Sequence, residues 1–257
     1  APTPAAAPPE SGGTVLSASG YVTARRVATV SAEIVGKMQD ILVEEGSVVE
    51  AGQVLAHLDS TLAALDRDVA ASDRDAALAE KQNADSALKR LLGVTRGSVV
   101  SEADLTSARA AAASADARLE AAASRLARAE ALLEKYEIKA PFAGVVTSKD
   151  AQPGEIVSPS AAGGGSTRTG ICTIVDMTSL EIEVEVSESF ISRVTPGQKV
   201  TATLDAYPDL EIPAHVAAII PTANRDKATV KVRIAIEALD AKILPEMAAK
   251  VSFKDKT

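Results

Sequence analysis

Few side chains in this sequence could carry out chemistry, and those that could are far apart along the chain. The 257 residues contain one cysteine, Cys172, and two histidines, His57 and His215. A protein zinc site needs several Cys, His or carboxylate ligands together, and none of these three residues has a second Cys or His nearby. A single cysteine also excludes an internal disulfide. We therefore expect Cys172 to be a buried small apolar residue, the histidines to be structural, and no metal to be bound.

Neither the paired carboxylates nor the glycine-rich run of the chain resembles an active site. Glu44 and Glu45 lie beside a predicted turn, with no His, Ser or Cys placed to act with them. The run Gly-Gly-Gly-Ser-Thr at 163–167 lacks the Lys-Ser/Thr ending and the following helix of a phosphate-binding loop. We predict that the protein is not an enzyme and that it needs no cofactor.

The composition excludes some partners and predicts separate helical and strand regions. Net charge is -8, and no Lys/Arg cluster supplies the basic field that nucleic acid or an anionic membrane surface requires. Hydrophobic residues make up 46% of the chain and aromatic ones only 2%, so the apolar mass is Ala, Val, Leu and Ile. Because Ala favours helix whereas Val and Ile favour strand, we expect them in different segments. No apolar run approaches the ~18 residues of a membrane span, and residues 1–13, rich in Pro and Ala, suit an extended tether.

Two long helices are predicted between residues 60 and 137. The stretch from 61 to about 92 contains no Pro or Gly and follows N-cap residues at 59–61. A second helix begins at a capping box, residues 101–104, and is predicted to run to about Glu137. With arms of similar length, the two make an antiparallel hairpin about 50 Å long at ~1.5 Å per residue. A rod this thin buries little surface, so we expect its length to serve reach.

Apolar residues at alternating spacings of three and four predict a coiled-coil seam in each helix. In the second helix the seam is Leu105, Ala108, Ala112, Ala115, Leu119, Ala122, Leu126, Ala129, Leu133 and Tyr136. In the first helix a looser match gives Leu62, Leu65, Val69, Ala76 and Ala79.

The segments on either side of these helices, 30–59 and 138–176, look like two copies of one half-domain. Each is predicted to run strand, glycine turn, strand. The matching pieces are 36–38 and 43–55 in the first half, and 140–146, 152–157 and 171–175 in the second.

This double pattern resembles the biotinyl and lipoyl carrier fold, a sandwich of two quasi-symmetric halves. In carriers, a tight hairpin between the halves presents the lysine that takes the cofactor. Here the predicted helices occupy that junction, and no acceptor lysine remains at a tight turn. A carrier domain split by a helical hairpin resembles the periplasmic adaptors, or membrane fusion proteins, of the HlyD, AcrA and MacA type. The most specific segments are 44–53 and 138–146.

Short strands after the second half-domain complete the predicted architecture. Residues 180–186, 200–204, 215–220 and 228–236 are predicted strands, with a turn at 195–198. The fold class is therefore α+β and elongated. A coiled-coil hairpin (60–137) is inserted in a split lipoyl/biotinyl-like β-sandwich (30–59 and 138–176), followed by a small β-barrel (14–29 and 177–257).

The resemblance implies an adaptor subunit of a tripartite efflux or secretion pump. Such a subunit bridges an inner-membrane ABC transporter of the MacB type, or an RND transporter, and a TolC-like outer-membrane duct. It also implies a hexameric ring in the periplasm, an N-terminal inner-membrane anchor absent from this chain, and a missing membrane-proximal domain.

The hairpin tip is the expected contact with the duct. Adaptors that bind TolC-like ducts resemble one another there in an Arg, a Leu four residues on and a Ser seven beyond. Arg90, Val94 and Ser101 match, with Val in place of Leu. An Arg near a helix end and a Ser at a cap are also common for local reasons. Two other functions stay open: a biotin or lipoyl carrier subunit of an enzyme, and a coiled-coil scaffold unrelated to transport.

Overall fold

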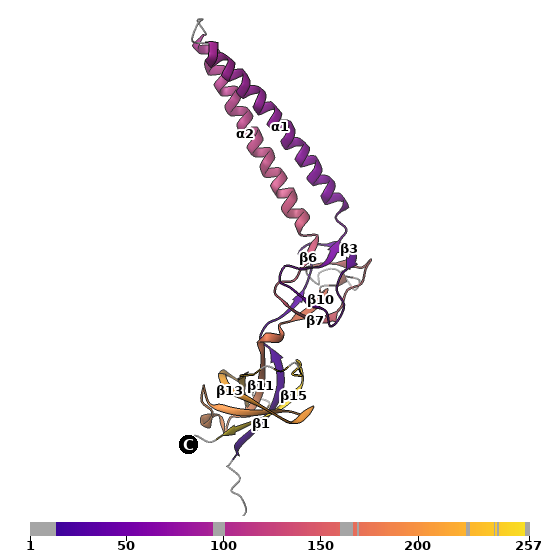
Figure 1. The fold of residues 1–257 in the computed structure, drawn as a ribbon, viewed down its shortest axis with the longest axis vertical. Coiled ribbons are helices and arrows are strands. Elements are labelled where there is room, and N and C mark those ends of the chain that lie inside the picture. The colour runs from indigo at the N-terminus through magenta and orange to yellow at the C-terminus, as the bar shows by residue number, and fades with distance from the viewer. Residues whose placement is uncertain are drawn as a thin grey trace, which may run out of the picture. The chain divides into compact units, whose positions relative to one another are not determined.

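The computed structural model (Figure 1) describes residues 14–94, 101–159, 167–168, 170–224, 227–238, 240 and 242–254. These divide into two compact units. One unit comprises the residues up to 28, 142–145 and those from 174 onward. The other comprises 29–141 and 146–173.

The first unit is built on a closed barrel of antiparallel strands. Their order around the barrel is β1 (Thr14–Ala24), β11 (Leu180–Ser187), β14 (Thr229–Ile236), β13 (Tyr207–Asn224), β12 (Lys199–Leu204) and β15 (Ala248–Lys254). Two short 3-10 turns, Met177–Ser179 and Ile191–Arg193, flank β11. The strand β15, which closes the barrel, was missing from the sequence prediction, and the prediction for 215–220 underestimated β13.

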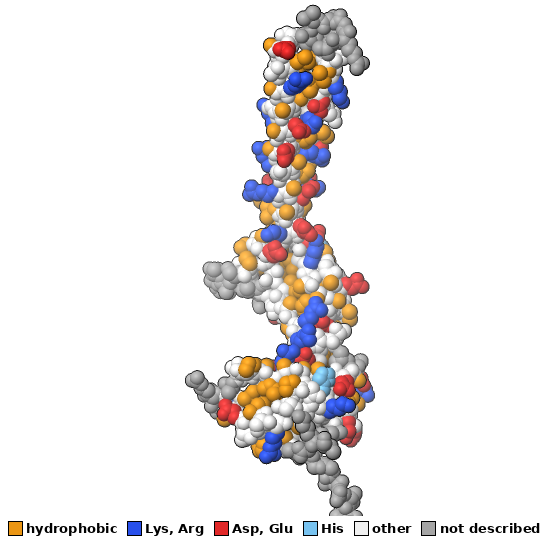
Figure 2. Space-filling model, turned by 90° about the vertical axis from the view of Figure 1, so that its left-hand side faces the viewer, with side chains coloured by type: hydrophobic (Ala, Val, Ile, Leu, Met, Phe, Trp, Pro, Cys, Tyr) orange, Lys and Arg blue, Asp and Glu red, His pale blue; other side chains and the backbone are white. Residues whose placement is uncertain are grey.

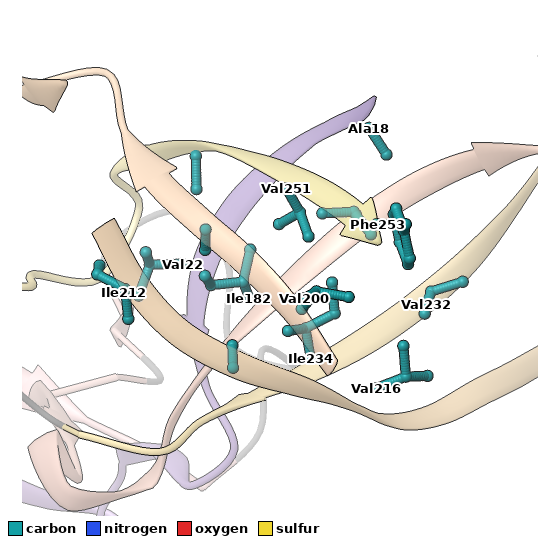
Figure 3. Packing of buried hydrophobic residues seen from close by; sticks show 14 of the residues in the cluster. Ala18, Val22, Ile182, Val200, Ile212, Val216, Val232, Ile234, Val251 and Phe253 are labelled. Atoms are coloured by element: carbon teal, nitrogen blue, oxygen red, sulfur yellow. The ribbon is translucent and has the colours of Figure 1, made fainter. Parts of the chain in front are cut away.

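Alternation along each strand places one row of side chains inside the barrel. On β11, Ile182, Val184 and Val186 are buried, as the period of two predicted. Figure 3 shows the labelled residues, Val22 and Phe253 among them, converging on this interior. At Gly20 a Cβ would lie 1.9 Å from the carbonyl oxygen of Glu183, so β1 and β11 approach this closely only with glycine.

A polar network holds together the two points where the chain leaves and re-enters the barrel. Arg26 donates to the Asp176 carboxylate at 3.3 Å, and its guanidinium lies 4.6 Å from the ring centroid of Phe142. Hydrogen bonds from Thr178, and then the charge of Arg26, lower the pKa of Asp176 below its ordinary value. These contacts keep a carboxylate whose side chain is only 8% exposed in its charged form.

Two small sheets form the sandwich, and most of their residues belong to the second unit. One has the order β2 (Val27–Val30), β10 (Cys172–Val175), β7 (Gly144–Lys149), β4 (Val48–Val49). The other has the order β6 (Glu137–Lys139), β5 (Val54–Leu58), β3 (Gly36–Ile41), β8 (Ile156–Val157), β9 (Thr167–Arg168). Each sheet therefore combines strands from both sides of the helices.

The glycine turn of each predicted half-domain hydrogen-bonds to a strand of the other half-domain. The Gly46 turn of the first half bonds Val146 of the second through a backbone pair of 2.8 and 3.0 Å. The Gly154 turn of the second half bonds Met38 of the first through a pair of 2.8 and 2.8 Å. Both glycines have positive φ, 84° and 91°, which other residues rarely adopt. The repeat in the sequence thus corresponds to a repeat in hydrogen bonding.

The helical hairpin is inserted between β5 and β6 and consists of α1 (Thr61–Val94) and α2 (Glu102–Glu134). The Asp59 carboxylate accepts hydrogen bonds from the backbone N–H and the hydroxyl of Thr61. These bonds satisfy a free donor at the start of α1. The end of α2 was predicted too late. The chain turns at Lys135, the Tyr136 carbonyl accepts a 2.9 Å bond from Leu58, and β6 then begins.

The seam predicted for α2 is confirmed. Its buried and half-buried side chains from 102 to 136 are the ten predicted ones, with Ala112, Ala115 and Ala122 fully buried. Tyr136 also faces inward, although it lies just past the helix. Alanine at half of the seam positions lets the two backbones approach closely, while the leucines supply most of the buried area.

The seam predicted for α1 is wrong. Leu62, Leu65 and Val69 are 77%, 57% and 61% exposed, and Ala76 and Ala79 are exposed as well. The buried and half-buried positions of α1 instead include Ala63, Arg67, Ala70, Arg74, Ala77, Lys81, Ala84, Leu88 and Leu91. The aliphatic stems of the three basic residues lie in the seam, and their charged groups pair with nearby aspartates. Our prediction assumed that the largest apolar side chains face the partner helix.

Candidate functional site

The three predicted tip residues lie at the same end of the hairpin (Figure 1). Arg90 is one turn before the end of α1, and its side chain is exposed. Val94 is the last residue of α1, and Ser101 is the N-cap of α2. The turn between them, 95–100, lies outside the described residues, as does the Val94 side chain.

Ser101 has a local role that accounts for its presence. Its hydroxyl accepts a 3.2 Å hydrogen bond from the backbone N–H of Ala103 and so satisfies a free donor at the start of α2. Of the predicted capping box, the structure shows the serine cap, bonded to Ala103. Glu102 and Asp104 in the first turn also suit the positive end of the helix dipole.

Basic side chains lie at the tip end of the other helix, α1. Lys89 and Arg90 lie near the carboxyl end of α1, where a cation is favoured. An approaching partner therefore meets exposed basic side chains on one helix end and acidic ones on the other. Such an arrangement can bind backbone carbonyls, carboxylates and basic side chains.

Ion pairs below the tip fix the register of the two arms. Lys81 of α1 bonds Asp85 at 2.9 Å and Asp116 of α2 at 3.3 Å, and both partners raise its pKa. One step away, Arg118 of α2 pairs with Glu80 of α1. Figure 2 shows basic and acidic side chains interspersed along the hairpin, with no single-sign patch on the visible face.

The cysteine and the two histidines lie apart from one another, each in its own surroundings. Cys172 is buried, and burial raises the pKa of its thiol to about 11. The His57 ring bonds Asp40 at 2.7 Å, and His215 lies 3.5 Å from Glu237. Among the described residues, no three His, Cys, Asp or Glu side chains come together as metal ligands. Within the same part of the chain, neither helix has an apolar stretch able to span a membrane.

Sequence reasoning missed two features of the hairpin. The first is the basic seam of α1, whose signal was the seven-residue spacing of Arg67, Arg74 and Lys81. The second is Leu92, which is 45% exposed two residues beyond Arg90 and adds apolar surface close to the tip.

Comparison with protein families matches most of the chain. Residues 26–162 match the CzcB-like, barrel-sandwich hybrid domain. Residues 180–257 match the CusB-like, beta-barrel domain.

The curated relatives are longer than this chain. The chain is 27% identical over 218 residues to nodulation protein NolF of Rhizobium meliloti, covering 85% of this chain and 57% of NolF. It is 27% identical over 254 residues to macrolide export protein MacA of Yersinia pestis, covering 92% of this chain and 67% of MacA. The chain therefore spans a little over half to two thirds of these relatives.

Solved structures share the fold. The membrane fusion protein Spr0693 from Streptococcus pneumoniae R6 matches with a TM-score of 0.74 at 22% identity, over 94% of this chain and 100% of that one. MacA from Actinobacillus actinomycetemcomitans matches with a TM-score of 0.69 at 20% identity, over 94% and 78%. The barrel, the sandwich and the inserted hairpin recur in membrane fusion proteins, and this chain belongs to their family of periplasmic adaptors, with a CzcB-like barrel-sandwich hybrid domain.

Proposed function

We propose that this protein is the periplasmic adaptor of a tripartite efflux or secretion pump, joining an inner-membrane transporter to a TolC-like outer-membrane duct. The barrel (14–29 and 177–257) docks on the transporter, of the MacB-type ABC class or the RND class. The sandwich (30–59 and 138–176) is lipoyl-like and packs into a ring of six copies. The hairpin (60–137) reaches the duct. A segment preceding this chain anchors the protein to the inner membrane.

The observation that supports this proposal most is the place of the hairpin. Strands β5 and β6 are neighbours in one sheet, with His57 opposite Glu137, so a tight turn could join them. The chain instead extends α1 over 34 residues, about 50 Å at ~1.5 Å per residue, before returning. An excursion that buries little of its own surface is useful when its far end has a partner.

At the tip, Arg90 is the proposed anchor, because a guanidinium can bond two acceptors on a facing helix. Val94 is the proposed apolar contact. Ser101 combines its cap with contact to the duct, so its hydroxyl keeps α2 in place while one side of the cap stays accessible.

Charge reversal at the tip tests the assignment. Arg90→Asp and Ser101→Asp are compared with Arg109→Asp and Ser107→Asp, which are exposed positions further down α2. Aspartate is as good an N-cap as serine, so Ser101→Asp adds charge without loosening the helix. We expect the tip variants to lose site-specific cross-linking to the duct and export, and the shaft variants to keep both. Equal export by all four variants refutes the tip assignment.

The carrier alternative predicts a covalent cofactor. Lys135 and Lys139 lie at the base of the hairpin, and Lys139 pairs with Glu134 and Glu137 at 2.9 and 3.3 Å. An ammonium held in this way on a strand is unlike a lysine presented at a tight turn. Intact-mass measurement after coexpression with a biotin or lipoyl ligase should show no added mass, and a cofactor-sized gain defeats the adaptor proposal.

A further inference from the structure

Lys81 connects the two arms of the hairpin from within the seam. Its ammonium lies 3.3 Å from the Asp116 carboxylate on α2, and its side chain is only 28% exposed. The other basic seam residues of α1, Arg67 and Arg74, pair with aspartates of their own helix at 3.0 and 3.2 Å. Within the described part of the chain, Lys81 is thus the one of the three whose ion pair crosses to α2. A lysine at a single seam position can specify the register of a coiled coil at some cost in stability.

The seam near Lys81 is made mainly of small side chains. Apart from the basic residues, most of the buried and half-buried positions of both helices at this level are alanines. They are Ala70, Ala71, Ala77, Leu78 and Ala84 on α1, and Ala108, Ala112, Ala115, Leu119 and Ala122 on α2. Short identical side chains form shallow knobs, so one helix can slide past the other with little change in packing. A specific ion pair is therefore needed to fix the relative heights of the helices here.

The Lys81 ion pair lies far from the base of the hairpin and close to its tip. At the base, the backbone hydrogen bond between Leu58 and Tyr136 holds the two arms at fixed heights. Along α1, Lys81 lies about 30 Å beyond Thr61 but only nine residues, about 13 Å, before Arg90. The base is too distant to fix the tip through an alanine-rich seam, whereas the ion pair is near enough to do so.

We propose that Lys81 is a positioning residue for the tip: by pairing with Asp116, it sets the height of Arg90 on α1 against Ser101 on α2. This role rests on the proposed function, in which Arg90 and Ser101 contact the duct together. A slide of one residue displaces them by about 1.5 Å relative to each other, whereas a hydrogen bond tolerates ~0.5 Å in length. Lys81 thus acts on duct binding through the geometry of the tip and does not touch the duct.

A positioning role and a merely stabilising role predict opposite effects of an apolar substitution. Lys81→Met keeps the length of the side chain and removes its charge, and Asp85 and Asp116 stay hydrated because their side chains are 38% and 67% exposed. Ion pairs this exposed contribute little to stability, and apolar replacements of partly buried ones are often neutral or stabilising. We expect the urea midpoint of Lys81→Met to equal or exceed that of the unsubstituted protein, while duct cross-linking and export fall several-fold.

The geometry of the tip is measured on the purified protein without the duct. Ser86→Cys and Ala110→Cys place nitroxide labels at exposed positions of the two arms, between Lys81 and the tip, for a distance measurement by double electron–electron resonance. The native Cys172 stays unlabelled, because it is buried and its thiol pKa is raised to about 11. We expect one narrow distance distribution in the labelled protein, a broader or displaced one after Lys81→Met, and the narrow one again after Lys81→Arg.

Two further variants separate the cross-helix pair from the mere loss of a seam cation. Arg74→Met is the matched control, since Arg74 pairs with Asp75 of its own helix, and it should leave the tip distance and export unchanged. Lys81→Asp should broaden the tip distance, because it places a third carboxylate beside Asp85 and Asp116. Adding Asp116→Lys should restore the distance by reversing the pair.

Four results overturn the positioning role of Lys81. They are an unchanged tip distance in Lys81→Met, a urea midpoint that falls together with export, the same losses in Arg74→Met, and a charge swap that does not restore the tip distance.

Failure of this role and failure of the proposed function give different results. If Arg90→Asp loses export while Lys81→Met keeps the tip distance or keeps full export, the duct contact stands and the positioning role is refuted. If Lys81→Met changes the tip distance while Arg90→Asp and Ser101→Asp keep full export, Lys81 still sets the register of the arms and the duct contact is refuted.

Discussion

Truncating one leucine on each arm of the hairpin distinguishes the observed seam from the predicted one. Leu126→Ala removes a half-buried side chain of the α2 seam, and Leu65→Ala removes one that is 57% exposed in the monomer. Fully buried Leu→Ala changes cost about 2–5 kcal/mol, so we expect roughly 1.5–2 kcal/mol at Leu126. At Leu65 we expect about 0.5 kcal/mol or less, as at ordinary surface positions.

Both changes replace leucine by alanine in a helix, so the difference in helix propensity cancels between them. The assay is urea unfolding followed by far-UV circular dichroism, which is dominated by the hairpin, at a concentration where the protein is monomeric. The free energy of unfolding is compared at equal m-value. If Leu65→Ala destabilises the monomer as much as Leu126→Ala, or more, the basic seam of α1 is wrong. Leu132→Ala, at a position 42% exposed on α2, is the matched control and should behave like Leu65→Ala.

Three further predictions concern the barrel. Gly20→Ala should destabilise it severely, because the new Cβ would lie 1.9 Å from the Glu183 carbonyl oxygen, and thermal unfolding should show a lower midpoint or no folded barrel. Glu246→Gly should raise the free energy of unfolding by about 0.5–1 kcal/mol, because Glu246 has φ 65° and glycine removes that strain at a smaller entropic cost. Asp176 has a lowered pKa, so its stabilisation is present above the unfolded carboxyl value near ~4 and is lost as pH falls through the folded value. Asp176→Asn should lower stability at neutral pH. It should also weaken the dependence of the thermal unfolding midpoint on pH in the acid range, measured by tyrosine fluorescence.

Local sequence signals predicted the elements whose burial is decided within a single strand or helix. The α2 seam and the alternation in 180–186 were correct because each element has one apolar face. The outcome for α1 differs because that helix has two candidate faces, one with Leu62, Leu65 and Val69 and one with alanines and basic residues. Which face turns inward is decided by packing against the partner helix, and the local sign of it was the seven-residue spacing of Arg67, Arg74 and Lys81.

Long-range pairing explains the other differences between prediction and structure. Strand β15 lies between β1 and β12, far from both in sequence, and its place in the barrel is set by pairing with those two strands. The tip residues show the opposite case. Their positions at the ends of α1 and α2 follow from cap and length signals, whereas no local signal identifies the partner that we propose for them.

The hydrogen bonds between the glycine turns of one half-domain and the strands of the other affect how the protein folds during its synthesis. The Gly46 turn bonds Val146, and the Met38 strand bonds the Gly154 turn, so the early half of the sandwich emerges from the ribosome long before its complement. At ~5–20 residues per second, it waits several seconds without its partner strands. Helical hairpins form locally on far shorter timescales, about a microsecond for helix relaxation. The hairpin brings Leu58 next to Tyr136 and so places the second half-domain beside the first. This lowers the loop-closure entropy that the two halves would otherwise lose when they pair.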